Sequence, residues 1–262
     1  MKLPPQLFRY RPFDIPTEKC LKCGEAADSS GRDQRERVCF AETRLYAPSR
    51  TQFNDPFDCL ALSFDHIPKA DLEAFIDKMT EQAFTEMSPV ARQAKAQELK
   101  RYSASDLQRT SQEMADYLGI LSFSTKPDNL LMWSHYANSH KGFCLEFDTQ
   151  YEPFDKAWPV AYSLRRPKYE LSTDSLKNAQ HLVLTKSLDW AYEDEWRVVL
   201  PKGGEKYAFP PIALKGVIFG DAMSASSKNK IREWINEGPC SPAVYQAKCT
   251  TGDFGLDIEP EP

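Results

Sequence analysis

The stretch Trp190-Ala191-Tyr192-Glu193-Asp194-Glu195-Trp196-Arg197-Val198-Val199-Leu200 places three acidic residues between aromatic rings and then becomes apolar. Its apolar end, residues 197–200, is closed by Pro201 and predicts a short buried strand. Residues two apart in an extended chain point to the same side, so we expect Glu193 and Glu195 to share one face. Crowding raises the pKa of at least one of two such carboxylates, which suits proton transfer or stabilisation of a cationic transition state.

The same residues also allow a purely structural interpretation. One glutamate can pair with Arg197 while the rings of Trp190 and Trp196 pack in the core, because structural ion pairs also place acids beside aromatic rings. Residue types alone favour this interpretation. The rest of the chain therefore has to decide between a catalytic and a structural role.

Composition narrows the class of protein. Of the 262 residues, 41% are hydrophobic, which is enough for an ordinary core, and the net charge of -5 argues against a generally basic nucleic-acid binder. No run of 18 apolar residues occurs, so we expect no membrane-spanning helix. Residues 1–13 contain no apolar signal core, and the seven cysteines are an odd number. These features predict a cytoplasmic protein with reduced thiols.

The order of strand-like and helical segments predicts an α+β fold. Residues 7–13 alternate apolar and charged side chains, which indicates a first strand. Residues 68–118 carry apolar side chains at helical spacing. Two clusters of strands with helices between them are typical of α+β proteins, not of a regular βαβ alternation. No glycine-rich phosphate loop follows a strand, which excludes a Rossmann or P-loop fold.

The expected elements suggest one domain. We expect a single α+β domain over residues 1–250, with the helical segment 68–118 inserted, a variable loop at 17–37 and a flexible acidic tail at 251–262. Further helices are expected at 130–138, 172–184 and 224–237. Further strands are expected at 44–48, 60–64, 120–125, 143–147, 160–163, 197–200 and 212–220.

Two features resemble metal or turn motifs. Cys20 and Cys23 form a Cys-x-x-Cys pair, which is half of a structural zinc site, but no second pair of Cys or His follows at finger-like spacing. We therefore expect free thiols in a surface loop and no metal.

Residues 54–56, Asn-Asp-Pro, are a strong turn signal. Since Phe53 and Phe57 flank them, we expect the turn to be anchored in the core.

Three segments in order resemble the Arg…Ser-Thr-Ser…Glu-x-Glu pattern of ADP-ribosyltransferases: Arg9 with Arg11, then 122–125, then 193–195. The resemblance implies NAD as the substrate. An arginine can hold its pyrophosphate with two parallel hydrogen bonds. A carboxylate near the ribose stabilises the positive charge that develops as the nicotinamide–ribose bond breaks.

Five further blocks resemble the bacterial domain-of-unknown-function family 2971, and together they extend from about Leu7 to Trp234. They are 8–11 (FRYR), 53–58 (FNDPFD), 132–136 (MWSHY), 140–144 (HKGFC) and 190–197 (WAYEDEWR). The resemblance implies a cytoplasmic bacterial protein, and some members of the family are associated with abortive infection and mobile elements. The placement of the motifs is compatible with an ADP-ribosyltransferase-like split β-sheet core.

These observations predict an ADP-ribosyltransferase or NAD glycohydrolase-like enzyme. It would cleave NAD and pass ADP-ribose to a protein, a nucleic acid or water, as a toxin or anti-phage effector with an antitoxin or defence-system partner. Glu195 is the expected catalytic carboxylate, and Glu193 is expected to activate the acceptor or to position Glu195. The expected cofactor-binding residues are Arg11 or Arg9 for the phosphates, Ser122 and Ser124 for orientation, and Tyr10, Tyr136 or Trp190 for stacking on nicotinamide. Strand alternation places Tyr10 on the opposite face from both arginines.

Two alternatives remain open. The chain could be a non-enzymatic module that senses a phage or partner protein through its aromatic surface, with the acids in structural ion pairs. It could also be a metal nuclease that uses Asp55, Glu193 and Glu195 with Lys186 or Arg197. The acids do not form an Asp…Glu-x-Lys signature, so the nuclease ranks last.

Overall fold

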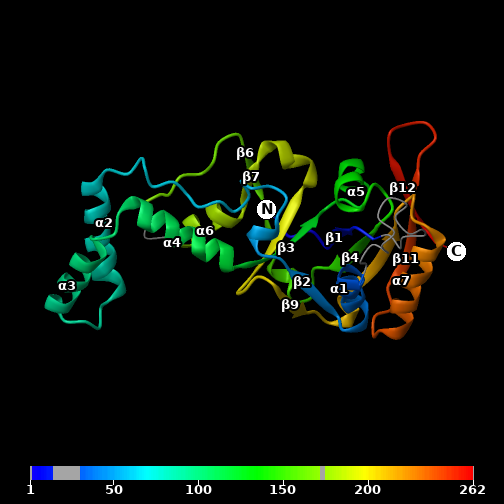
Figure 1. The fold of residues 1–262 in the computed structure, drawn as a ribbon, viewed down its shortest axis with the longest axis horizontal. Helices are drawn as coiled ribbons and strands as arrows, with labels where there is room; N and C mark the ends of the chain where they lie inside the picture. Colours follow the sequence, from blue (N-terminus) through cyan, green and yellow to red (C-terminus); the bar gives the residue numbers. More distant parts are fainter. Residues whose placement is uncertain (1, 14–29, 172–174, 262) are drawn as a thin grey trace, which may run out of the picture. The chain divides into compact units, whose positions relative to one another are not determined.

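The structure is a computed structural model that describes residues 2–13, 30–171 and 175–261. It divides into two compact units, drawn in Figure 1. Unit 1 contains Met1–Pro48, Gly119–Val160 and Asp189–Pro262, and unit 2 contains Ser49–Leu118 and Ala161–Leu188. This division differs from the single domain expected over residues 1–250. The helical segment 68–118, expected as an insertion, belongs to unit 2 together with a second, later segment of the chain.

Unit 1 is built on a mixed eight-stranded sheet in the order β12-β11-β10-β4-β1-β3-β8-β5. β10 and β11 are parallel, and the other neighbours are antiparallel. The strands are β1 (Gln6–Arg11), β3 (Gly119–Ser124), β4 (Phe143–Asp148), β5 (Trp158–Pro159), β8 (Glu195–Leu200), β10 (Leu214–Phe219), β11 (Ala243–Cys249) and β12 (Leu256–Pro260). A separate pair joins β2 (Arg44–Ala47) to β9 (Glu205–Ala208). The mixed sheet and its helices confirm the α+β class.

The register of the central strands divides the side chains between two faces. Directly paired residues of neighbouring strands lie on the same side of a sheet, and successive residues alternate. Phe8 pairs with Ser124, and Ser124 pairs with Glu195. We call this side the carboxylate face; it carries Phe8, Tyr10, Ser122, Ser124, Cys144, Glu195 and Arg197. The other side is the arginine face; it carries Leu7, Arg9, Arg11, Phe123, Phe143, Leu145 and Trp196.

The arginine face holds the larger apolar core. Helices α1 (Ser30–Ala41) and α7 (Ala225–Glu237) lie side by side (Figure 1) and contribute Phe40 and Trp234 to this core. The Trp234 ring lies 5.3 Å from that of Phe13 and 6.3 Å from that of Phe40, between ring centroids. Such aromatic pairs contribute about 0.5–1.5 kcal/mol beyond the area that they bury.

The carboxylate face is covered by the short helix α5 (Leu130–Tyr136), as predicted for residues 130–138. Trp133 is completely buried, and its ring meets the Tyr10 ring edge-on at 5.2 Å. The helix begins at Asn129, whose side chain accepts hydrogen bonds from the backbone N–H groups of Leu131 and Met132. This cap satisfies two of the donors that a helix start leaves open.

Unit 2 consists of the helices α2 (Lys69–Ala83), α3 (Pro89–Leu99), α4 (Ala104–Tyr117) and α6 (Ser175–Val183) and the strand pair β6 (Ala161–Ser163) and β7 (Thr185–Ser187). α3 begins at Pro89, and the Ser88 side chain before it accepts a hydrogen bond from the Ala91 N–H. The two segments of this unit are joined by the stacked rings of Phe64 and Tyr169, 4.2 Å apart. Among the helices of the described residues, none is both long and apolar enough to cross a membrane.

Two expectations about individual segments are wrong. Residues 60–64 form no strand, only an isolated bridge between Ser63 and Lys168. The tail expected to be flexible forms β12, and the Glu261 carboxylate that follows is held by Arg232 at 2.6 Å and Lys228 at 3.5 Å. The acidic tail is therefore ordered by the cations of α7.

The variable loop expected at 17–37 needs a similar correction. Residues 14–29, with Cys20 and Cys23, lie outside the described residues, but residue 30 onward forms α1. Glu36 of α1 is buried and forms a bidentate ion pair with Arg11 of β1. The pair ties α1 to the central strand, a contact that local sequence patterns do not reveal.

The two ion pairs of α1 provide a matched test. We expect Glu36→Gln to lower the free energy of unfolding by about 2 kcal/mol, because it leaves the Arg11 guanidinium without its carboxylate. The exposed pair between Arg37 and Glu237, 3.1 Å apart, serves as the control, and Glu237→Gln should cost less than about 0.5 kcal/mol. Urea denaturation of both variants measures the difference, and equal losses would contradict the burial argument.

Candidate functional site

The candidate site lies at one end of the carboxylate face in unit 1. There β3 ends at Ser124 and β8 begins at Glu195, and these two residues are paired. The chain leaves β3 through residues 125–129 into α5, and it enters β8 from the 3-10 helix η3 (Leu188–Glu193). Two loops and a helix start therefore meet beside the paired strand ends.

Glu195 and Arg197 form an ion pair within β8. Arg197 Nε lies 2.8 Å from Glu195 Oε1, and Arg197 Nη2 lies 2.9 Å from Oε2. Arg197 is completely buried and Glu195 is 5% exposed. Both side chains point to the same face because they are two residues apart on a strand. The structural interpretation, in which Arg197 pairs with a glutamate, is thus what the structure shows for Glu195.

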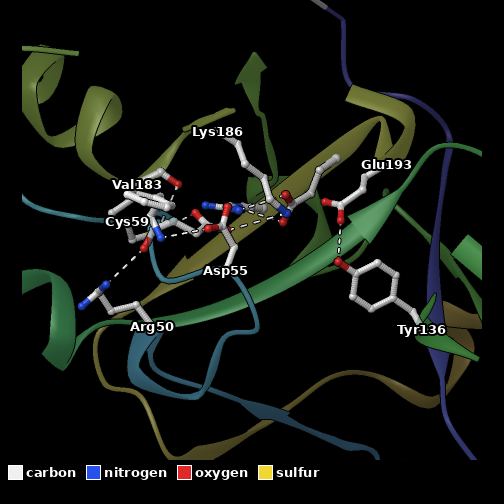
Figure 2. Close-up of polar contacts among 11 residues, drawn as sticks. Arg50, Asp55, Cys59, Tyr136, Val183, Lys186 and Glu193 are labelled. Atoms are coloured by element: carbon white, nitrogen blue, oxygen red, sulfur yellow. Dashed lines mark hydrogen bonds and ion pairs between the residues drawn. The ribbon is translucent and has the colours of Figure 1, made fainter. Parts of the chain in front are cut away.

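Glu193 does not share an extended segment with Glu195, contrary to the sequence-based expectation. It ends η3, and Asp194 adopts a left-handed conformation with φ 46° before β8 begins. Glu193 is also buried, and its Oε1 accepts a hydrogen bond of 2.5 Å from the Tyr136 hydroxyl. Figure 2 shows the Tyr136 hydroxyl of α5 directed at this carboxylate. This hydrogen bond links the end of η3 to α5.

A set of polar contacts fixes the turn between η3 and β8. The Thr125 hydroxyl donates to the Asp194 carboxylate, and the Thr125 N–H donates to the Asp194 carbonyl at 3.3 Å. Asn129 Nδ2 donates to the Tyr192 carbonyl at 2.6 Å while its Oδ1 caps α5. Thr125, Asn129 and Asp194 were not predicted as site residues. The available signal was the turn sequence before a short helix, which places Asn129 at a cap position.

Aromatic side chains lie next to Glu193. The rings of Trp190 and Tyr192 are 6.1 Å apart, and both side chains are half-buried. His135 Nδ1 and the Tyr192 hydroxyl are 2.9 Å apart, with the His135 side chain exposed. Trp190, predicted as a stacking residue, therefore lies in the chain segment that leads to the buried carboxylate.

Of the three predicted binding residues Tyr10, Ser122 and Ser124, two are buried and one is half-buried. Ser124 is completely buried, and its Oγ accepts from the Lys126 N–H, which is a turn contact. The Tyr10 hydroxyl donates to the Lys126 carbonyl at 2.6 Å, and burial raises the pKa of Tyr10 above its ordinary value. Both residues are structural. Ser122 is half-buried and lies opposite Arg197 in the register, so it stays a candidate.

The structure contradicts the expected placement of Arg9 and Arg11 beside Glu195. Both arginines lie on the arginine face, with the sheet between them and the glutamates. Arg11 pairs with Glu36; burial lowers its pKa, but the adjacent carboxylate outweighs this and raises the pKa above its ordinary value. The Arg9 guanidinium lies 5.6 Å from the centre of the Phe123 ring. The expectation that Tyr10 faces away from both arginines is confirmed.

In unit 2, the predicted Asn54-Asp55-Pro56 turn is confirmed. Asp55 Oδ1 accepts from the Phe57 N–H at 2.9 Å, and Arg50 donates to the carbonyls of Pro56 and Asp58. Phe57 is 65% exposed, so the expected anchoring of the turn by this ring is wrong.

Lys186 is buried in unit 2, and its Nζ lies 3.7 Å from Asp58 Oδ2. It thus forms an ion pair within this unit. His, Cys, Asp and Glu side chains form no group of three or more that could hold a metal ion in the part of the chain that the structure describes.

Comparison with known proteins gives one match. Residues 132–198 match the model of a family described as a protein of unknown function, DUF2971. The matched segment runs from α5 into β8 and includes Tyr136, Glu193, Glu195 and Arg197, which supports the family resemblance seen in the sequence motifs. No curated protein gives a significant match, and no solved structure does so.

The ion pair of β8 predicts a large loss of stability on neutralising one partner. Glu195→Gln removes the carboxylate from a completely buried guanidinium, and we expect the free energy of unfolding to fall by about 3 kcal/mol. The double variant Glu195→Gln/Arg197→Met removes both charges and should recover part of that loss. Urea denaturation gives both values; a single variant as stable as the wild type would show that the pair is not structural.

The two functions of the Asn129 side chain can be separated. Asn129→Ala loses the helix cap and the bond to Tyr192, and we expect a loss of about 2 kcal/mol. Asn129→Asp keeps the acceptor for the cap but loses the donor, so its loss should be about 1 kcal/mol. Thermal unfolding compares the two, and equal losses would exclude a contribution from the Tyr192 bond.

Proposed function

We propose that this protein cleaves the nicotinamide–ribose bond of NAD, with Glu193 as the carboxylate that stabilises the transition state. The observation that carries the proposal is the buried Glu193 carboxylate, which accepts a hydrogen bond of 2.5 Å from the Tyr136 hydroxyl and ends the short segment that carries the rings of Trp190 and Tyr192. A fixed carboxylate in a site of low dielectric interacts more strongly with a developing cation than one in water.

Glu193 fits this role better than Glu195. Both carboxylate oxygens of Glu195 accept hydrogen bonds from the guanidinium of Arg197. The positive charge of Arg197 at this distance cancels most of the electric field that the Glu195 carboxylate would exert on a substrate. The Tyr136 hydroxyl, a neutral donor, orients the Glu193 carboxylate. Glu195 and Arg197 act instead as positioning residues, because their ion pair fixes the first residues of β8, which begins two positions after Glu193.

The chemistry follows from these positions. The C1′–N bond of NAD breaks, its electron pair leaves with nicotinamide, and the ribose becomes an oxocarbenium ion beside Glu193. An acceptor hydroxyl, or water, then attacks C1′ to form the new C1′–O bond and releases its proton to solvent. Trp190 and Tyr192 offer ring faces for the nicotinamide. Ser122, half-buried on the same face, is a partner for a ribose hydroxyl.

The phosphates of NAD need a cation on this face, since Arg9 and Arg11 lie on the other. Lys126 follows Ser124 in the turn after β3, and its side chain is exposed. Its backbone is fixed at both polar groups, by the Ser124 Oγ and the Tyr10 hydroxyl. We assign Lys126 to the phosphates in place of the two arginines.

The wider function rests on the family resemblance and extends the same proposal. The sheet of unit 1 would correspond to an ADP-ribosyltransferase-like split sheet. The protein would act in the cytoplasm as a toxin or anti-phage effector on a protein or nucleic-acid acceptor, with an antitoxin or defence-system partner. The alternative, a non-enzymatic sensing module, is favoured by one observation: the ion pair of Glu195 and Arg197 has the burial and geometry of a structural contact.

The test measures nicotinamide by chromatography after incubation of the protein with NAD. Glu193→Gln should lower the rate by roughly two to three orders of magnitude, the usual cost of losing one preorganised electrostatic group. Its melting temperature should change little, because Gln still accepts from the Tyr136 hydroxyl. Glu205→Gln, on an exposed strand, is the matched control and should keep the wild-type rate.

Other outcomes separate the alternatives. A wild-type protein that releases no nicotinamide in the presence of candidate acceptors would refute the proposal and favour the sensing module. Cleavage of nucleic acid that requires Mg²⁺ would favour the nuclease. An active wild type whose rate is unchanged by Glu193→Gln would remove Glu193 from the catalytic role.

A further inference from the structure

The arginine face contains a buried cation whose hydrogen bonds are incomplete. Arg9 is 7% exposed, and its Nη2 donates to the Tyr46 carbonyl at 3.3 Å. Its Nη1 is buried and has no hydrogen-bond partner among the described residues. Buried donors without a partner are rare in folded proteins, and one that belongs to a charged group is more costly than a neutral one.

The charges around Arg9 do not balance. Arg9 and Arg11 lie on the same face of β1, two residues apart. Within the described part of the chain, Glu36 is the only carboxylate that forms an ion pair with either arginine, and it is bound to Arg11. Among the described residues, Arg9 is therefore left without a paired carboxylate. Consistent with this, burial and the neighbouring Arg11 lower the pKa of Arg9 to about 9.

Two other described neighbours of Arg9, Phe123 and Cys39, supply no negative charge. The Phe123 ring lies against the guanidinium, 5.6 Å from Cζ to the ring centre. The Cys39 thiol on α1 is buried, and its pKa is raised far above neutral pH by burial, so it is uncharged. A ring face and a carbonyl oxygen stabilise the cation in part but leave the Nη1 donors unsatisfied.

We propose that Arg9 binds an oxyanion, a phosphate group, on the arginine face through its Nη1 donors. The planar guanidinium matches the geometry of phosphate oxygens, and a bound anion would supply both the missing hydrogen bonds and the missing charge. This site is distinct from the one proposed for NAD cleavage, because the sheet lies between Arg9 and the carboxylates of β8 and η3. The phosphate is free phosphate or part of a nucleotide, and the test separates these sources.

The test is the melting temperature of the full chain in buffers of equal ionic strength. Inorganic phosphate at tenfold excess over its Kd should raise the wild-type melting temperature by about 3 °C relative to chloride. A larger shift with AMP at the same concentration assigns the site to a nucleotide phosphate, and a smaller one assigns it to free phosphate. A wild type with no shift in either anion overturns the proposal.

Variants tie the effect to Arg9. Arg9→Met should abolish the phosphate shift and, in chloride, melt no lower than the wild type, because it removes an unbalanced charge from the core. Arg44→Met removes an exposed cation from β2 and should keep the wild-type shift. A full phosphate shift in Arg9→Met would overturn the assignment.

A second variant covers the case in which Arg9→Met does not fold. Arg9→Lys keeps the charge and loses the planar fork, so calorimetric titration with phosphate should give a Kd at least tenfold weaker than that of the wild type. An unchanged Kd would show that the anion binds elsewhere.

Discussion

Side-chain alternation in the central strands is the constraint on which the rest of unit 1 depends. β1, β3, β4 and β8 are paired without a register shift, so each residue number determines one of two faces. The arginines of β1 are thereby committed to the face that holds the large apolar core, and the glutamate of β8 to the face covered by α5. A shift of one residue in any of these strands would exchange the two sets.

Three arginines of the central sheet in unit 1 have different electrostatic partners. Arg197 is paired with a carboxylate on its own strand, and Arg11 with one on a helix far away in the sequence. Arg9 forms no ion pair with a carboxylate among the described residues. The first arrangement needs only strand geometry, whereas the second needs α1 to dock correctly. Since breaking such pairs costs several kcal/mol, the docking of α1 and the start of β8 are both strongly specified.

Local patterns in the sequence were sufficient for most elements and insufficient for the site. The alternation before Pro12 and the apolar run after Glu195 correctly predict β1 and β8, and the turn at Asn54–Pro56 follows from local chemistry. The pairing of Arg11 with Glu36 and of Tyr136 with Glu193 depends on tertiary packing, which no local pattern encodes. Glu193 was expected on an extended segment, but the left-handed Asp194 separates it from the strand. The acidic tail was judged by composition alone, and the cations of α7 that order it lie elsewhere in the sequence.

The order of strands in the sheet has a consequence for the synthesis of the chain. β1, formed by residues 6–11, is paired on both sides by strands that begin only at residues 119 and 143. Unit 2 is likewise incomplete until residues 161–188 have left the ribosome. The apolar side chains of β1 therefore lack their partners during much of translation, and neither unit can close through contacts local in sequence. Such long-range pairing slows folding and prolongs the interval in which nascent chains can associate or recruit chaperones.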